Sequence, residues 1–518
     1  MSEPQELRYQ ADLVVTDLAG RHARRWSRRH DVAVACGETS RSWVDLDDRV
    51  RRLAGGLVAR GVGAGDVVAV FAKNRVEFFE IVLATATIGA VAAPQSFRSS
   101  VHELEHGLAA TGARVLIAES TGDLAERTRQ IVKRHANLMF IDLGERGAGE
   151  YEAIVRSGDP DGVHPGPGEL DAFWLGLTGG TTGLPKVVRV PHRVIVQMWL
   201  YMVIEFDTRP SDSMLVAGPL HHGLGFGFAL QQLYVGGRVV VLPEFDARGV
   251  LEAIASEGIT VLPAAPTMLA LMLDAWDDEP VDIDSLRVVI SAGSSLPAVT
   301  KRRLAAAVPD VALYEHYGAT EAGFFTVLAP EDQFRKERSC GAAFFGSRIR
   351  VLRDDGTTAD PGEVGHIAKQ GLVQGGGYAG NPDATAKMWC GDWSTVGDLG
   401  YVDEEGYLFL VDRADDTIVS GGVNIFPAEI EAAIGELEGV SEVGVIGVPD
   451  DRWGQIVQAF VVRRTGAGDV TEQAVIDACL ARLAPYKRPR LVTFVEELPK
   501  SAAGKVLRRE LRRAGADR

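Results

Sequence analysis

The loop at residues 177–187 concentrates the residue types that bind a polyphosphate. Glycines let backbone N–H groups converge on an anion, and hydroxyls and an ammonium group add further donors. A glycine-rich stretch is more often a plain connector. Here, however, Pro185 stiffens the loop just before Lys186, and apolar residues typical of buried strand flank it. We therefore interpret the loop as a phosphate clamp. Its donor residues are Thr178, Gly179, Gly180, Thr181, Thr182, Gly183 and Lys186.

A second group of residues, 317–321, has the sequence Tyr-Gly-Ala-Thr-Glu and follows a predicted strand at 311–314. A tyrosine before a glycine can stack on a base while the backbone turns, and Thr320 and Glu321 then offer a hydroxyl and a carboxylate. A carboxylate beside a polyphosphate implies a magnesium ion between them. Alone, a Tyr-Gly turn is more often a packing feature, so this motif depends on the others for support.

Three charged residues further along the chain could complete such a site. Asp398 follows a glycine, where aspartate is usually a turn residue. Arg413 lies among acidic residues, and Lys505 follows Gly504 near the end of the sequence. A basic residue in that position is normally solvated, but the glycine gives the backbone before Lys505 unusual freedom.

Residues 221–228 place two histidines before a stretch that contains only glycine and apolar residues. Two adjacent histidines could bind a metal, but no further ligand lies at a suitable spacing. The glycine-rich stretch predicts either the wall of a small-molecule pocket or a helix start that packs in the core.

Together these motifs resemble, in order and spacing, those of the adenylate-forming superfamily, in its AMP-dependent acyl-CoA synthetase branch. The resemblance covers roughly residues 35–515. The loop is similar to the form T-S-G-T-T-G-x-P-K-G, with Gly179 in place of serine and Val187 in place of glycine. It differs from the P-loop of NTPases, whose lysine follows a glycine and precedes serine or threonine.

The resemblance implies a role for each motif residue. It implies four catalytic residues: Lys505, His222, Glu321 (on magnesium) and Thr320. It implies an ATP and AMP site made of Thr178, Gly179, Gly180, Thr181, Thr182, Gly183, Lys186, Gly293, Ser294, His316, Tyr317, Gly318, Thr320, Asp398 and Arg413. It implies an acyl pocket of Gly223, Gly225, Phe226 and Phe324, a coenzyme A tunnel at Gly421 and Gly422, and a hinge at Asp415. His221 replaces the aromatic residue that is usual before the gating histidine.

A lysine on a movable domain has a physical purpose in this chemistry. Joining a carboxylate to the α-phosphate of ATP brings two anions together, and at ~4 Å their repulsion is of order 4 kcal/mol at an effective dielectric constant of 20. A cation between them removes this barrier. After pyrophosphate leaves, the domain can swing away and admit a second nucleophile.

The periodicity of the chain predicts an α/β protein. Strands at 67–71, 115–118, 213–218, 238–242, 259–262 and 287–291 alternate with helices, which is typical of layered, mostly parallel sheets. Residues 145–168 contain many glycines and prolines without apolar periodicity, so we expect a connector there. Short, turn-separated segments after 330 predict a small antiparallel sheet or barrel.

The resemblance implies a corresponding domain plan. A large N-terminal domain at 1–412 would comprise two layered α/β subdomains, about 1–168 and 169–330, and a small β-barrel at 331–412. A hinge at 413–416 would join it to a small mobile α+β lid domain at 417–518.

Length and composition limit the protein's class. At 518 residues the chain is long enough for two or more domains. Its net charge of −17 argues against nucleic acid or an anionic membrane as the main partner. The longest apolar run, 81–94, is shorter than the ~18 residues of a membrane span. The sequence starts without a secretory signal and its four cysteines are far apart, so we expect a cytoplasmic enzyme with reduced thiols. Its oligomeric state stays open, with a homodimer as one option.

The expected reaction is ATP- and Mg²⁺-dependent activation of a small carboxylic acid to an acyl-adenylate, followed by transfer to coenzyme A. Residues 420–427 resemble the acyl-CoA synthetase form of the lid loop. The stretch after His222 lacks the aspartate that would hold a substrate ammonium, so an uncharged aryl, alicyclic or medium-chain acid is favoured over an amino acid. The alternatives are transfer to a carrier-protein thiol or to an amine, and, less expected, a protein that binds nucleotide without turnover.

Overall fold

The computed structural model describes residues 13–25, 27–144, 149–162, 166–178, 185–371, 377–450, 452–464, 470–500 and 506–516. Internal contacts divide the chain into two compact units. The first comprises residues 1–337, 344–347 and 371–386, and the second comprises 338–343, 348–370 and 387–518. Each unit is therefore built from more than one segment of the sequence.

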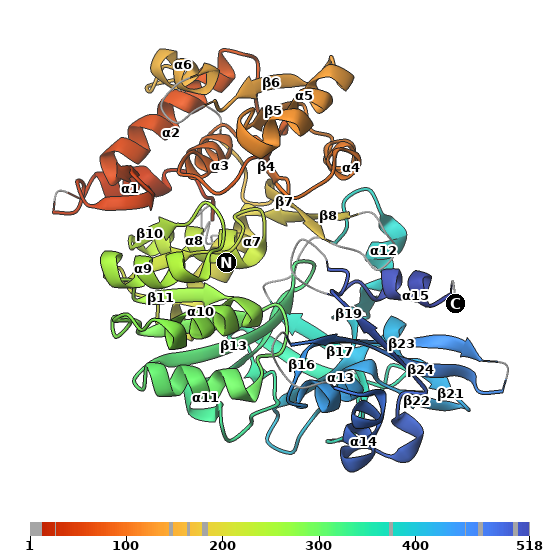
Figure 1. Ribbon diagram of the computed structural model, residues 1–518. Helices are drawn as coiled ribbons and strands as arrows, with labels where there is room; N and C mark the ends of the chain where they lie inside the picture. Colours follow the sequence, from red (N-terminus) through yellow and green to blue (C-terminus); the bar gives the residue numbers. More distant parts are fainter. Residues whose placement is uncertain are drawn as a thin grey trace, which may run out of the picture. The chain divides into compact units, whose positions relative to one another are not determined.

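The first sheet of the first unit has the strand order β6-β5-β3-β4-β7-β8 (Figure 1). Its strands are β3 (Val67–Phe71), β4 (Val91–Pro94), β5 (Val115–Ala118), β6 (Met139–Asp142), β7 (Ala172–Thr178) and β8 (Lys186–Pro191). Neighbouring strands pair in parallel except β7 and β8, which form an antiparallel hairpin. Because Thr178 lies opposite Lys186 in this hairpin, both ends of the loop at 179–184 are held by the sheet.

A second sheet of this unit has the order β14-β13-β12-β11-β9-β10-β1-β2. Its strands are β1 (Val32–Cys36), β2 (Thr39–Ser42), β9 (Ser213–Val216), β10 (Arg238–Val241), β11 (Val261–Ala264), β12 (Val288–Ala292), β13 (Ala312–Ala319) and β14 (Gly323–Leu328). The early strands β1 and β2 thus lie beside late ones, whereas the later strands β7 and β8 belong to the first sheet. Sequence order and sheet membership therefore do not coincide.

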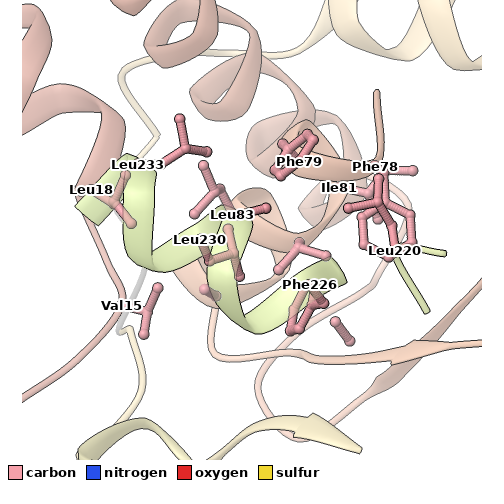
Figure 2. Close-up of a cluster of buried hydrophobic side chains, with 14 of the residues drawn as sticks. Val15, Leu18, Phe78, Phe79, Ile81, Leu83, Leu220, Phe226, Leu230 and Leu233 are labelled. Carbon is pink, nitrogen blue, oxygen red and sulfur yellow. The ribbon is translucent and has the colours of Figure 1, made fainter. Parts of the chain in front are cut away.

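Helices connect the parallel strands, as such crossovers require. The helices of the first unit are α1 (Leu18–Ala23), α2 (Trp43–Val58), α3 (Glu77–Thr87), α4 (Val101–Thr111), α5 (Ala125–Arg134), α6 (Glu150–Ser157), α7 (His192–Glu205), α8 (Gly223–Val235), α9 (Ala247–Glu257), α10 (Pro266–Asp278), α11 (Ala298–Ala307) and α12 (Pro382–Lys387), of which some, such as α1 and α12, do not join parallel strands. The first turn of α2 is stabilised by a capping box between Ser42 and Asp45. Figure 2 shows one face of α8, with Phe226, Leu230 and Leu233, in the main hydrophobic core.

The expected connector at 145–168 is wrong in part, because α6 lies within it. Tyr151 of this helix is fully buried, and its hydroxyl donates to Glu80 at 2.7 Å. Glu80 also accepts from Arg49, which links α6 to α2 and α3. The helix was missed because it has only two turns, so its apolar residues show no clear helical periodicity among the surrounding glycines and prolines.

The second unit contains two small sheets. The first is a half-barrel of order β16-β17-β19-β18, with β20 paired to β19. Its strands are β16 (Ser347–Leu352), β17 (Gly365–Gly371), β18 (Trp389–Cys390), β19 (Trp393–Val402) and β20 (Leu408–Arg413). The other has the order β22-β21-β24-β23, with β25 beside β24. Its strands are β21 (Ile418–Ser420), β22 (Val423–Ile425), β23 (Val440–Asp450), β24 (Gly454–Arg463) and β25 (Leu491–Val495).

Helices α13 (Pro427–Gly435), α14 (Glu472–Arg482) and α15 (Arg508–Ala516) complete the second unit. Arg508 of α15 contacts Glu431 of α13 at 2.7 Å and Asp416 at 3.0 Å. Burial lowers the pKa of Arg508, but the neighbouring carboxylates outweigh it and raise that pKa above its ordinary value. The end of the chain is thereby tied to the segment that follows β20.

The predicted α/β fold class is confirmed, and the strands expected between 213 and 291 are present within two residues of their predicted ends, with helices between them. Among the described residues, no helix combines the length and the apolar character that crossing a bilayer demands.

Candidate active site

The β7–β8 hairpin and one tyrosine together organise the base of the predicted phosphate loop. Residues 179–183 lie outside the described part of the chain, but Thr178 and Lys186 face each other across the hairpin. The Nζ atom of Lys186 lies 4.8 Å from the centre of the Tyr378 ring. Such a cation–π contact is worth about 0.5–1 kcal/mol at a partly exposed site.

Tyr378 also contacts the predicted magnesium carboxylate. Its hydroxyl donates to Oε1 of Glu321 at 2.9 Å. Its position is set by the backbone, because Tyr378 forms a bridge to Val188 and the N–H of Ala379 donates to the carbonyl of Val187 at 2.8 Å. One tyrosine therefore joins the lysine of the loop to the carboxylate of the second motif.

The sequence interpretation missed Tyr378. The signal available was weak: an aromatic residue after the glycine run 375–377 and before the proline that starts α12. Nothing in this local pattern shows that the tyrosine reaches β8 and Glu321.

The motif at 317–321 lies where β13 ends and turns into β14, so the predicted strand before it is longer than expected. Gly318 is required there, because a Cβ atom would lie 2.8 Å from the carbonyl oxygen of Gly323. Gly176 of β7 has a related purpose, since a Cβ atom would lie 3.1 Å from the methyl group of Thr320. Two glycines thus allow Thr320 to lie directly against the hairpin that carries the phosphate loop.

The loop after β12 carries Gly293 and Ser294. Gly293 has a φ of +97°, and no other atom lies within 4 Å of where a Cβ would stand. Ser294 is exposed. Glu315 of β13 ties this loop to the motif strand by accepting from the N–H of Leu296 at 3.2 Å, and Lys301, almost fully buried, pairs with the same carboxylate. Burial raises the pKa of Glu315.

His316 lies in an aromatic cluster. Its ring centre is 4.4 Å from that of Phe324 and 5.7 Å from that of Phe228. Both ring nitrogens are buried, and neither has a hydrogen-bond partner within the described residues. Burial lowers the pKa of His316 to about 4, so the ring is neutral at pH 7. Its predicted nucleotide role stays a prediction; the structure places it next to Phe324, which was assigned to the acyl pocket.

The two histidines before α8 differ in environment. His222 is exposed and directly precedes the first residue of the helix. His221 instead packs edge-on against Phe97 at 5.5 Å, and burial lowers its pKa to about 3. His221 therefore behaves as the aromatic residue that it replaces.

The glycines of α8 face different surroundings. A Cβ atom on Gly225 would lie 2.5 Å from the carbonyl oxygen of Pro219, so this glycine allows close packing of the helix start. At Gly223 and Gly227 a Cβ atom would meet no atom of the described chain within 4 Å, apart from the local helix backbone. Phe226, also assigned to the acyl pocket, packs in the core on another face of the helix (Figure 2).

In the second unit, Asp398 and Arg413 lie opposite each other on β19 and β20. The Nε–H of Arg413 donates to Oδ1 of the buried Asp398 at 3.0 Å. Gly421 and Gly422 adopt φ values of +60° and +81°, which favour glycine.

The predicted hinge residue, Asp415, belongs to a short 3₁₀ turn at Ala414–Asp416. Lys505, the predicted mobile lysine, lies outside the described residues.

Glu321 suits a magnesium ion that is also coordinated by phosphate oxygens of a bound nucleotide. Among the residues that the structure describes, no cluster of three or more histidine, cysteine or acidic side chains could hold a metal. Magnesium commonly uses one or two carboxylates and completes its shell with phosphate oxygens and water. Glu321, oriented by Tyr378, fits this pattern.

Comparison with known proteins gives an independent view of the chain. Its sequence matches the AMP-binding enzyme family over residues 21–379 and the AMP-binding enzyme C-terminal domain over 429–505. A feruloyl-CoA synthase from Amycolatopsis sp. is 35% identical over 488 residues, which cover 93% of this chain and 96% of that protein.

Two solved structures resemble this chain over nearly its whole length. MatB from Rhodopseudomonas palustris bound to ATP has a TM-score of 0.88 at 28% identity, covering 98% of this chain and 99% of MatB. The o-succinylbenzoate CoA synthetase MenE of Bacillus subtilis, in complex with the acyl-adenylate intermediate OSB-AMP, has a TM-score of 0.85 at 27% identity, covering 96% of this chain and 98% of MenE.

Proposed function

The chain belongs to the AMP-binding enzyme family, and we propose that it is an AMP-forming ligase that joins a small carboxylic acid to coenzyme A with ATP and magnesium. In the first half-reaction the acid and ATP give an acyl-adenylate and pyrophosphate. In the second, the acyl group passes to the thiol of coenzyme A and AMP is released.

The observation that carries this proposal is the linkage of Lys186, Tyr378 and Glu321 beside the β7–β8 hairpin. A cation at the base of a glycine- and threonine-rich loop favours bound phosphates, and a carboxylate close by favours a metal ion on those phosphates.

In the adenylation step, an oxygen of the acid's carboxylate attacks the α-phosphorus of ATP. The bond from that phosphorus to the bridging oxygen breaks, and pyrophosphate leaves with the electron pair. Lys186 and the loop hold the phosphates, and Lys505 lies between the two anions as they approach. Magnesium, when bound, neutralises charge on the phosphate oxygens; Glu321 holds it and Tyr378 orients Glu321.

The nucleoside part would be bound by several of the predicted site residues. Tyr317 stacks on the base, with Gly293 and Ser294 at its edge. Asp398 accepts from the ribose hydroxyls, and Arg413, which contacts Asp398, fixes the orientation of that carboxylate. A prealigned acceptor reduces the ordering cost of nucleotide binding.

In the thioester step, the thiol sulfur of coenzyme A attacks the acyl carbon and gives up its proton to water. The bond from this carbon to the phosphate oxygen breaks, and AMP leaves with the electron pair. Gly421 and Gly422 would give the narrow pantetheine arm a path past the lid loop, and His222 would stand at the entrance to the acid. This step needs a hinge at 413–416 that lets the lid, residues 417–518, change orientation. The contacts of Arg508 with Asp416 and Glu431 would keep the lid rigid from the hinge onward.

The acid is proposed to be uncharged apart from its carboxylate, and aryl, alicyclic or of medium chain length. The glycine and apolar residues after His222 support this, because they offer no carboxylate for a substrate ammonium. Transfer to a carrier-protein thiol or an amine is the alternative for the second step. A screen of pyrophosphate release over aryl, alicyclic and C2 to C12 acids, with and without coenzyme A, tests both steps. Absence of pyrophosphate with every acid would refute the proposal.

A further inference from the structure

Gln231 of α8 is a buried side chain whose polar atoms lack partners. It is fully inaccessible to solvent, and neither its Nε2 nor its Oε1 atom has a hydrogen-bond partner within the described residues. A buried, unpaired amide usually costs stability, and most buried polar groups in native proteins are paired. Such a group therefore needs an explanation.

The position of Gln231 on the helix supplies one. Residues four apart lie on the same face of an α-helix, so Gly223, Gly227 and Gln231 form one line along α8. Within the described residues, no atom outside the local helix backbone lies within 4 Å of a Cβ built on either glycine, and Gly227 is nevertheless buried. This face of the helix therefore has open space beside it among the described residues, and the proposed function assigns that space to the acyl pocket.

The depth of the pocket along this face of α8 follows from helix geometry. Gly223, next to His222, is partly exposed, whereas Gly227 and Gln231 are buried. The pocket therefore deepens toward Gln231, over about 12 Å of helix axis. Helical side chains lean back toward the helix N-terminus, so we expect Gln231 to lean toward this space.

The walls of this region favour an aromatic ring. Phe228 of α8 lies 6.2 Å from Phe324 and 5.6 Å from Phe206. His316 packs on the same Phe228 and brings two more buried nitrogens without partners in the described chain. An apolar acid would leave all these polar atoms unpaired.

We propose that Gln231 closes the acyl pocket and hydrogen-bonds a hydroxyl group at the far end of an aryl acid, so that the substrates of this enzyme are oxygen-substituted aryl acids rather than plain hydrocarbon acids. A hydroxyl suits an amide because it can donate to Oε1 and accept from Nε2 at once. This inference rests on the proposed ligase function and narrows its substrate class.

The test compares 4-hydroxycinnamate with cinnamate, which lacks only the hydroxyl, by kcat/KM for pyrophosphate release. The wild-type enzyme should prefer the hydroxylated acid by about tenfold or more, because a site built for a hydrogen bond rejects an analogue that lacks it. Gln231→Leu should remove this preference by lowering kcat/KM for 4-hydroxycinnamate about tenfold, while cinnamate stays within about threefold. Gln231→Met should behave in the same way.

Gln232, the next residue, provides a matched control. Its Nε2 donates to the carbonyls of Asp212 at 2.9 Å and Arg209 at 3.3 Å, whereas its Oε1 has no partner within the described residues; unlike Gln231, its donor group is therefore paired within the protein. Gln232→Leu should lower Tm and leave the ratio between the two acids unchanged. Gln231→Leu should not lower Tm, since it removes an unpaired polar group.

Three results would overturn the inference while the ligase function stands. The first is equal wild-type activity with both acids, and the second is better wild-type activity with C6 to C12 alkanoic acids than with 4-hydroxycinnamate. The third is a Gln231→Leu variant that has a lower Tm and loses activity with both acids alike. If no acid at all supports pyrophosphate release, the proposed function itself fails, which is a different outcome.

Discussion

The hydroxyl of Tyr378 offers the most sharply defined test of the site. Tyr378→Phe removes one oxygen atom and keeps the ring below Lys186, as well as the backbone bridge to Val188. What is lost is the hydrogen bond to Glu321 at 2.9 Å. The change therefore separates the orientation of the carboxylate from the packing around it.

The expected magnitude follows from the type of bond. A hydrogen bond to a charged group contributes roughly 1.5–3 kcal/mol, and both partners here are partly exposed, which favours the lower value. About 1.5 kcal/mol corresponds to about tenfold. We expect kcat/KM for ATP in adenylation to fall about tenfold, with a matching increase in the magnesium concentration required.

The control variant is Tyr378→Leu, which also removes the ring. Loss of the contact with Lys186 should add about 0.5–1 kcal/mol, a further two- to fivefold. Thioester formation from supplied acyl-adenylate should change little in either variant.

Pyrophosphate release at varied magnesium gives the kinetic measurement, and electron paramagnetic resonance of Mn²⁺ with bound ATP gives a direct measure of metal affinity. The reasoning is refuted if Tyr378→Phe binds Mn²⁺ as the wild type does, or if both half-reactions lose rate equally.

Three further predictions concern other parts of the chain. Asp398→Ala should raise KM for ATP at least tenfold and leave Tm within a few degrees, because Asp398 is proposed to hold the ribose; an unchanged KM would contradict this. Gly227→Ala should lower kcat/KM for aryl acids more than for propionate without loss of Tm, whereas Gly225→Ala should lower Tm; equal effects would exclude the pocket at Gly227. Burial lowers the pKa of His192 to about 4, so between pH 6.5 and 4 the unfolded state binds more protons than the folded state. The free energy of unfolding therefore falls as the pH falls, by up to about 3 kcal/mol. His192→Asn should flatten the dependence of this free energy on pH, as measured by urea titration, and an unchanged slope would assign the loss to other groups.

The motifs could be identified from sequence because each carries its chemistry in a short stretch. Gly318 and Thr320 are two residues apart in the chain, and the backbone around Gly318 tolerates no Cβ. Asp398 and Arg413 lie opposite each other across β19 and β20, and their role on one shared ligand stays a prediction.

Features that depend on distant contacts could not be predicted in this way. Tyr378 has importance only because β8 and Glu321 lie beside it, and these segments are far apart in the sequence. Gln231 looks like an ordinary helical residue until its missing partners and the empty face of α8 are known. The sequence also does not predict that β1 belongs to the second sheet and β7 to the first, because a buried strand has the same apolar pattern in either sheet.

The central claim is that a cation carried by the lid brings a carboxylate and ATP together. The most direct measurement compares Lys505→Ala with the wild type in the two half-reactions: ATP–pyrophosphate exchange with an accepted acid, and thioester formation from supplied acyl-adenylate and coenzyme A. We predict that exchange is lost while thioester formation stays within a few fold of the wild type. An equal loss in both half-reactions, or full exchange activity in Lys505→Ala, would contradict the account.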